Sequence, residues 1–118
     1  MSTNLREKEE KILQVLNRLE KENAKGIPII VEGKKDVQSL RELCISGEVL
    51  EAKTGGKSLI EVIFEIREGG RREVILLLDF DRRGRRLTRS LKQHLEKMKI
   101  KPNTYFWRRL KAIVGRDV

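Results

Sequence analysis

The sequence predicts an α/β domain in which helices cover both faces of an open parallel sheet of about four strands. Three observations lead to this fold class. Short apolar runs of strand length alternate with longer stretches whose apolar residues recur at helical spacing. Two of these runs end directly in acidic residues, at the position where open parallel sheets form their sites. The length of 118 residues suits one domain with one modest core.

The first half of the chain predicts two helices and two strands. Residues 4–22 carry apolar side chains on one stripe, which indicates an amphipathic helix packed on the domain. The apolar run 29–31 predicts a strand that is buried on both faces. Residues 34–44 predict a helix, and residues 48–52 a weaker strand. The helix over 34–44 is expected to turn four side chains inward: Val37, Leu40, Leu43 and Cys44.

The second half continues the alternation after a turn at 53–58. Ser58 and Glu61 have the spacing of a capping box, which starts a largely buried helix over 58–67. The run 74–78 predicts the strongest strand of the chain. Three further elements are expected after it: a helix over 84–99, a fourth strand over 103–106 and a short helix over 107–114.

The charge balance indicates a polyanionic partner. The chain has 27 Lys and Arg residues against 18 Asp and Glu residues, a formal net charge of +9, which attracts nucleic acid first and anionic membranes second. No run approaches the ~20 apolar residues of a membrane span, and the first residues lack the apolar core of a secretory signal. The single cysteine excludes an internal disulfide and a thiol-rich metal site. These features predict a cytoplasmic protein that binds RNA or DNA and no membrane.

Acidic side chains follow two of the predicted strands. Glu32 comes directly after the first strand, and Asp79 and Asp81 come directly after the third. If these strands are neighbours, their ends lie about 4.8 Å apart, and the three carboxylates converge in one crevice. Three clustered carboxylates repel one another, and a divalent cation resolves that repulsion. Oxygen ligands of this kind suit Mg²⁺, with Mn²⁺ as a substitute, so the sequence predicts a metal site at Glu32, Asp79 and Asp81.

Cationic side chains surround the predicted metal site. They lie in the loops and first helical turns that follow the strands, where they can hold the backbone of a nucleic acid beside the metal. The candidate nucleic-acid-binding residues are Lys34, Lys35, Lys57, Arg82, Arg83, Arg85 and Arg86.

These residues also have simpler interpretations. Glu32 and Asp36 suit the start of a helix, where the dipole favours an acid, and Asp81 suits the cap of the helix after it. The arginine run suits a solvated helix face. Two other phosphate sites are excluded: a P-loop needs a glycine where this chain has Glu51, and the haloacid-dehalogenase motif needs a threonine where it has Arg83.

Two acidic motifs together resemble the Toprim family. Its first strand is followed by a glutamate, here within "VEGKKD" from Val31 to Asp36. Its third strand is followed by a D-x-D pair and a glycine, here "DFDRRG" from Asp79 to Gly84. The glycine-bearing turn "TGGKS" is also similar. One departure is Arg85, where several relatives carry an acid. The resemblance covers roughly residues 27–106 and is carried by the two motifs jointly.

The resemblance implies a Rossmann-like three-layer fold with strand order 2-1-3-4. The Toprim domain is expected over residues 26–118, with an added N-terminal helix over 1–25. It implies that Glu32 is a general acid/base and that Asp79 and Asp81 are the magnesium ligands.

Two functions follow for such a chain: a small Mg²⁺-dependent nuclease on RNA or DNA, or a non-catalytic nucleic-acid-binding or complex-assembly module that keeps the metal site. A homodimer and a protein partner in RNA or DNA processing are both compatible with this interpretation, and the N-terminal helix or Trp107 would supply the contact surface.

Overall fold

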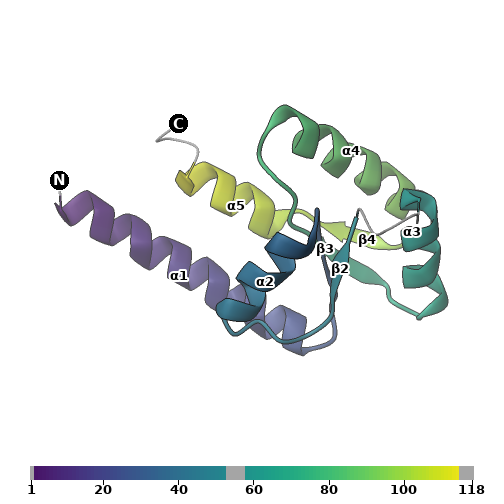
Figure 1. The fold of residues 1–118 in the computed structure, drawn as a ribbon, viewed down its shortest axis with the longest axis horizontal. Coiled ribbons are helices and arrows are strands. Elements are labelled where there is room, and N and C mark those ends of the chain that lie inside the picture. The colour runs from purple at the N-terminus through teal and green to yellow at the C-terminus, as the bar shows by residue number, and fades with distance from the viewer. Residues whose placement is uncertain (1, 53–57, 115–118) are drawn as a thin grey trace.

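The computed structural model describes residues 2–52 and 58–114, with side chains from Leu5 onward. These residues form a parallel four-stranded sheet between two layers of helices (Figure 1). The strands are β1 (Ile29–Val31), β2 (Val49–Glu51), β3 (Glu73–Leu76) and β4 (Lys101–Asn103). The helices are α1 (Ser2–Ala24), α2 (Lys34–Glu42), α3 (Leu59–Glu68), α4 (Arg82–Lys97) and α5 (Tyr105–Val114). The predicted fold class and the strand order 2-1-3-4 are confirmed.

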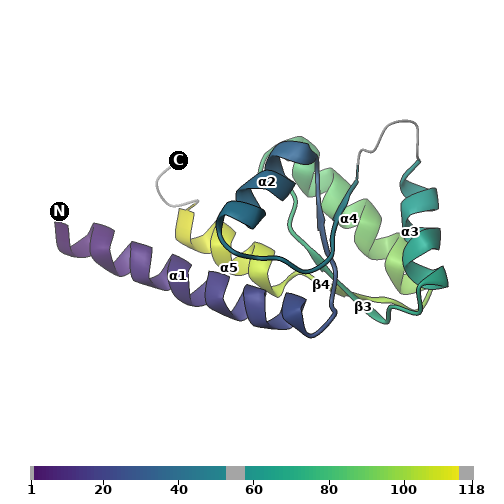
Figure 2. The same cartoon turned by 60° about the horizontal axis from the view of Figure 1, so that its bottom comes forward.

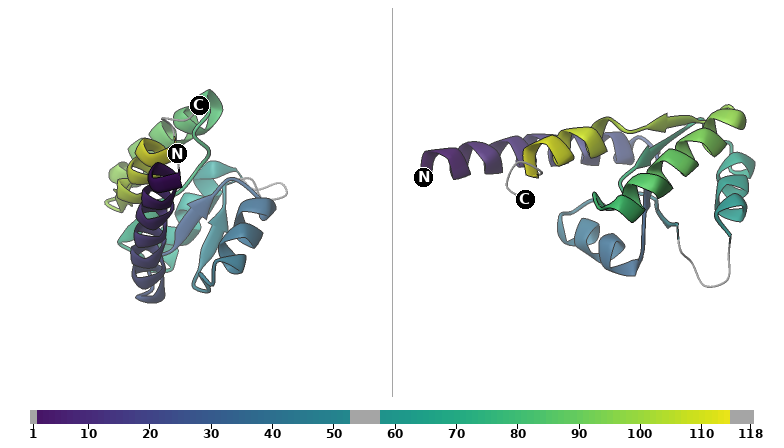
Figure 3. Two further views of the ribbon diagram at one scale, coloured as in Figure 1. Left: turned by 90° about the vertical axis from the view of Figure 1, so that its left-hand side faces the viewer. Right: turned by 90° about the horizontal axis from the view of Figure 1, so that it is seen from above.

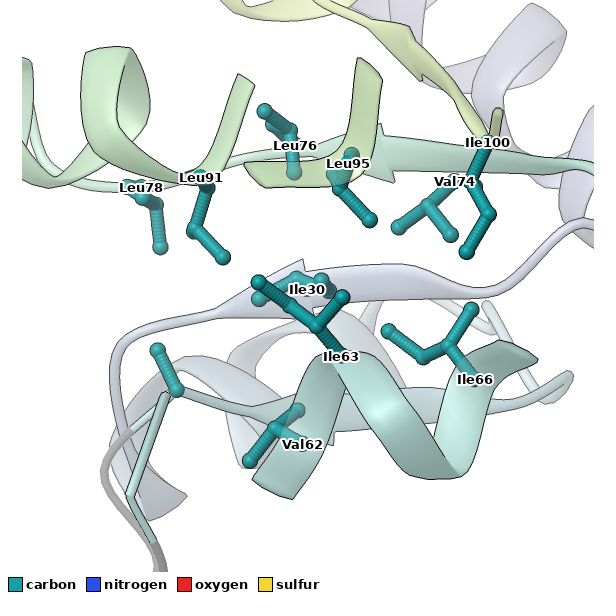
Figure 4. Close-up of a cluster of buried hydrophobic side chains, with 11 residues drawn as sticks. Ile30, Val62, Ile63, Ile66, Val74, Leu76, Leu78, Leu91, Leu95 and Ile100 are labelled. Atoms are coloured by element: carbon teal, nitrogen blue, oxygen red, sulfur yellow. The ribbon is translucent and has the colours of Figure 1, made fainter. Parts of the chain in front are cut away.

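The central strand, β1, contributes alternate side chains to two separate cores. Ile30 enters the layer covered by α3 and α4, where it meets Ile63 and Leu91 (Figure 4). Ile29 and Val31 enter the opposite layer, which α1, α2 and α5 cover. All three β1 side chains are almost fully buried, because side chains two apart share a face and both faces of this sheet are covered. The predicted burial of this strand on both faces is confirmed.

Helices α1 and α5 lie side by side over one face of the sheet (Figures 1 and 2). Val15 and Leu19 of α1 are buried there. The Arg18 guanidinium donates to the Tyr105 hydroxyl at 2.9 Å and lies 4.9 Å from the centre of that ring. The N-terminal end of α1 extends beyond the rest of the molecule (Figure 3). None of the described helices is both long and apolar enough to cross a membrane.

A buried asparagine fixes the junction between α1 and the sheet. Asn23 is 2% exposed, and its side-chain amide donates to the carbonyl oxygens of Ile27 and Glu48, both at 3.0 Å. Gly47 lies so close that a Cβ there would be 2.7 Å from the Asn23 Cγ atom. The two bonds tie the segment leading into β1 to the segment leading into β2, so one side chain sets the start of both strands.

The C-terminal end of α2 differs from the prediction. The helix ends at Glu42, and Cys44 has a left-handed backbone with φ of 64°. The Ile45 N–H donates to the Leu40 carbonyl at 3.0 Å, which closes the helix as a Schellman motif does. The reversal exposes Leu43 and Cys44 and buries Ile45 in their place. Leu43 and Cys44 are therefore not inward-facing core residues.

Two other expectations are wrong in detail. Helix α3 is buried at Val62, Ile63 and Ile66 only, because a helix on one side of a sheet buries one stripe, and it leaves Ile60 and Phe64 exposed. The fourth strand covers residues 101–103 and not 103–106. The Asn103 side-chain oxygen accepts from the Tyr105 N–H at 3.0 Å, in a turn that leads into α5 inside the segment expected to be a strand. Pro102 is tolerated because β4 is an edge strand.

Candidate metal and nucleic-acid site

The structure brings Glu32 and Asp79 together at the carboxyl edge of the sheet. Strands β1 and β3 are adjacent and parallel, with Ile30 opposite Leu76, so the residues after them emerge at the same edge. The ladder continues to Leu77, whose N–H donates to the Ile30 carbonyl at 2.9 Å. Beyond it, the Asp79 N–H donates to Oε1 of Glu32 at 3.4 Å. The glutamate of the first motif therefore contacts the backbone of the second, with no strand between them.

Asp81 caps helix α4. Its Oδ1 atom accepts from the Gly84 N–H at 2.7 Å, and its backbone is extended, as expected of an N-cap residue. The capping interpretation is confirmed for Asp81 in this structure. It is confirmed for Asp36 as well, whose Oδ2 accepts from the Gly33 N–H at 3.1 Å at the start of α2. The side chains of Asp79 and Asp81 are both exposed to solvent.

The donor chemistry of the acidic edge fits a hard divalent cation. Glu32, Asp79 and Asp81 are all carboxylates, and the first two are in contact through the Asp79 backbone. Within residues 2–52 and 58–114, however, no three Asp, Glu, His or Cys side chains lie close enough together to hold an ion as they stand. A carboxylate has two oxygens, so Asp81 can keep its cap through Oδ1 and offer Oδ2. Exposed carboxylates also change rotamer at small cost.

Gly84 allows α4 to start directly against Asp79. A Cβ atom at Gly84 would lie 2.6 Å from the carbonyl carbon of Asp79 and would overlap the carbonyl oxygen. The obstructing atoms belong to the backbone, which cannot turn aside as a side chain can. The glycine that closes the "DFDRRG" motif is therefore required by the close approach of the helix to the acidic residue.

Sequence reasoning missed the role of Trp107. Its indole Nε1 donates to the Leu78 carbonyl at 2.8 Å in a buried hydrogen bond. Its ring contacts that of Phe80 edge-on, with centroids 5.6 Å apart. The side chain is 8% exposed, so the expectation that Trp107 supplies an open contact surface is wrong. No local pattern identifies this role, because the contact joins residues 29 positions apart in the chain.

The predicted cationic residues flank the acidic edge. Lys34 and Lys35 open α2, and Arg82, Arg83, Arg85 and Arg86 occupy the first turns of α4. All six are exposed, and none of them forms an ion pair with another described residue. Their charge is therefore not neutralised by this part of the chain and is available to an anion. The remaining predicted residue, Lys57, lies outside the described residues, as does most of the turn that contains it.

Comparison with known proteins agrees with the resemblance to the Toprim family and with the fold. The family model of the Toprim domain matches residues 27–108. The UPF0292 protein MJ1624 of Methanocaldococcus jannaschii is 43% identical over 96 residues, which cover 80% of this chain and 72% of that protein. The UPF0292 protein Mbar_A0484 of Methanosarcina barkeri is 34% identical over 113 residues, 96% of this chain and 77% of that protein. A solved structure described as a putative protein from Aquifex aeolicus has a TM-score of 0.73 at 29% identity and covers 84% of this chain and 87% of its own.

Proposed function

Because this chain belongs to the Toprim domain family and is related to the UPF0292 proteins, we propose that it is a Mg²⁺-dependent nuclease acting on RNA or DNA. The family gives the chain a metal-dependent role related to nucleic acids; the cleavage of a phosphodiester bond is our proposal. It is supported by the contact of Glu32 with the Asp79 backbone at the edge from which the arginine-rich start of α4 emerges. We place this activity in the cytoplasm, in keeping with a single cysteine in the chain.

The residues divide into two roles in this proposal. Asp79 and Asp81 hold the cation, and bound Mg²⁺ supplies the polarisation of the phosphate. Glu32 exchanges a proton with the reacting oxygen, and its carboxylate already reaches the backbone beside the ligand Asp79. The first turns of α4 hold the phosphate chain through Arg82, Arg83 and the backbone N–H groups at the helix start.

A second function is favoured by one observation. Asp81 is engaged as a helix cap, and no three acidic side chains are assembled in the described residues. A protein that binds nucleic acid without cleaving it would keep the same basic surface and would not need the three carboxylates to converge. The alternative is therefore a binding or complex-assembly module of Toprim fold.

A cleavage and binding assay separates the two functions. We expect labelled single-stranded and duplex RNA and DNA to be bound with or without Mg²⁺, because the cations of α2 and α4 act independently of the metal. We expect cleavage only with Mg²⁺ or Mn²⁺, measured in single turnover with enzyme in excess, and its loss with EDTA. Binding without cleavage of any of the four substrates would leave the binding module as the function.

Removing one α4 arginine should reduce the salt dependence of nucleic-acid binding. For Arg85→Ala we expect the slope of log affinity against log salt concentration to become shallower by about 0.9 on duplex DNA and about 0.7 on a single strand, the value for one lost phosphate contact. Arg67→Ala, with the same charge change in the last turn of α3, is the matched control and should leave the slope unchanged. Equal slopes for the two variants would show that Arg85 does not contact phosphate.

A further inference from the structure

One peptide plane at the acidic edge is held from two sides. The Leu78 carbonyl accepts from the indole N–H of Trp107 at 2.8 Å, and the Asp79 N–H donates to the Glu32 carboxylate at 3.4 Å. The carbonyl of Leu78 and the N–H of Asp79 belong to the same peptide group. Because a trans peptide is planar, these two groups point in opposite directions and turn together. Trp107 of α5 and Glu32, which follows β1, therefore form hydrogen bonds with opposite sides of the same peptide group.

This plane lies where the sheet no longer supports the chain. Strand β3 makes its last ladder bond at Leu77, and Asp81 is the first residue fixed by α4, as its cap. Leu78 lies in the segment between these two residues. Its carbonyl accepts a buried hydrogen bond from the Trp107 side chain, which belongs to α5. A buried carbonyl without a partner is costly, so the tryptophan N–H determines which way this peptide faces.

Trp107 also holds the segment beyond Asp79. Its ring contacts the ring of Phe80, the residue between the two aspartates, with centroids 5.6 Å apart and planes inclined at 63°. The neighbouring Phe106 is 2% exposed and anchors α5 in the core that it shares with α1 and α2. Trp107 is thus attached to a packed helix on one side and to the acidic turn on the other.

From these contacts we infer that Trp107 is a positioning residue for the acidic turn, Asp79-Phe80-Asp81, and holds it in the form that accepts a divalent cation. It does not touch the ion; it sets the peptide from which the Asp79 side chain begins and which Glu32 contacts. The inference rests on the proposed function, because it assumes that the turn binds a cation. It adds to that proposal a residue from outside both acidic motifs.

Replacement of Trp107 by phenylalanine tests the inference directly. Trp107→Phe keeps an aromatic ring against Phe80 and removes the N–H that holds the Leu78 carbonyl. We expect Mn²⁺ affinity, measured from the electron paramagnetic resonance signal of free Mn²⁺, to fall about tenfold or more, as it does when groups that orient metal ligands are removed. Thermal unfolding followed by circular dichroism shows that each variant is folded at the temperature of the titration.

Tyr105→Phe is the matched control. It removes a hydroxyl from the same helix, one that accepts a hydrogen bond from Arg18 of α1 and not from the acidic turn. The inference is supported if Tyr105→Phe binds Mn²⁺ as the wild type does and Trp107→Phe binds it more weakly. Equal affinity of wild type and Trp107→Phe overturns the inference and leaves the proposed metal site intact. Failure of the wild type to bind Mn²⁺ overturns both.

A second measurement does not depend on how Trp107→Phe folds. Trp107 is the single tryptophan of the chain, so the fluorescence comes from one ring. That ring contacts Phe80 of the acidic turn, and its centre lies 5.0 Å from the Lys111 Nζ atom. We expect the emission of the wild type to change during a Mg²⁺ titration, with a midpoint equal to the Mg²⁺ affinity measured by competition with Mn²⁺. We also expect Phe80→Leu to lower the cation affinity, as Trp107→Phe does. Tryptophan emission that stays unchanged when the cation binds would contradict the inference.

Discussion

Glu32→Gln is expected to lower the single-turnover rate of phosphodiester cleavage by a factor of about 10²–10⁴ and to leave nucleic-acid affinity nearly unchanged. Glutamine has the shape of glutamate, and its amide oxygen can still accept from the Asp79 N–H. It cannot exchange a proton with the reacting oxygen. The rate is measured with enzyme in excess and saturating Mg²⁺, and affinity is measured by fluorescence anisotropy of the same labelled substrate.

Glu51→Gln provides the control for this experiment. Glu51 lies opposite Val31 in the pairing of β2 with β1, so it ends a neighbouring strand at the same edge of the sheet. The substitution removes the same charge from the same region and should leave cleavage close to the wild-type rate. A Glu32→Gln variant that cleaves as fast as Glu51→Gln would show that Glu32 transfers no proton in the reaction.

Gly84→Ala is expected to reduce the free energy of unfolding by about 3 kcal/mol or more, because the added methyl group collides with backbone and not with a movable side chain. The collision is with the carbonyl group of Asp79, so α4 and the acidic residue must separate. Cleavage and Mn²⁺ binding should fall with the loss of this contact. Urea unfolding followed by circular dichroism gives the free energy.

Gly33→Ala is the comparison for Gly84→Ala. Gly33 begins α2 at the other motif and has an extended backbone with φ of −154°, and a methyl group added there would meet no other atom within 4 Å. We expect this variant to change the free energy of unfolding by less than about 1 kcal/mol. If both alanine variants are equally stable, the close approach of α4 to Asp79 does not restrict residue 84.

The alternation of apolar runs was sufficient to predict the class of fold, because each buried element of this chain carries its own periodic pattern. The meeting of Glu32 with Asp79 was predictable for a related reason: parallel neighbouring strands end at one edge, so two acidic residues that follow them must lie near each other. The position of Lys57, which the same reasoning places near this edge, stays a prediction.

Features set by contacts between distant elements could not be predicted in the same way. The aromatic residues at 105–107 have the composition of a strand, but the Asn103 side chain forms a turn that leads into a helix there. The N–H of Trp107 finds its partner just beyond the end of β3. Likewise, Ile60 and Phe64 are as apolar as Ile63, and only the placement of α3 against the sheet decides which of them is exposed.

The division of β1 between two cores limits how this part of the protein can change. Strand β1 has three residues, and each successive side chain enters the opposite layer. Inserting or deleting a single residue inside β1 would exchange the two sets of side chains and turn Glu32 away from Asp79. Insertions or deletions within this strand are therefore tolerable only when they change its length by an even number of residues. This restriction follows from the sheet and applies whatever chemistry occurs at its edge.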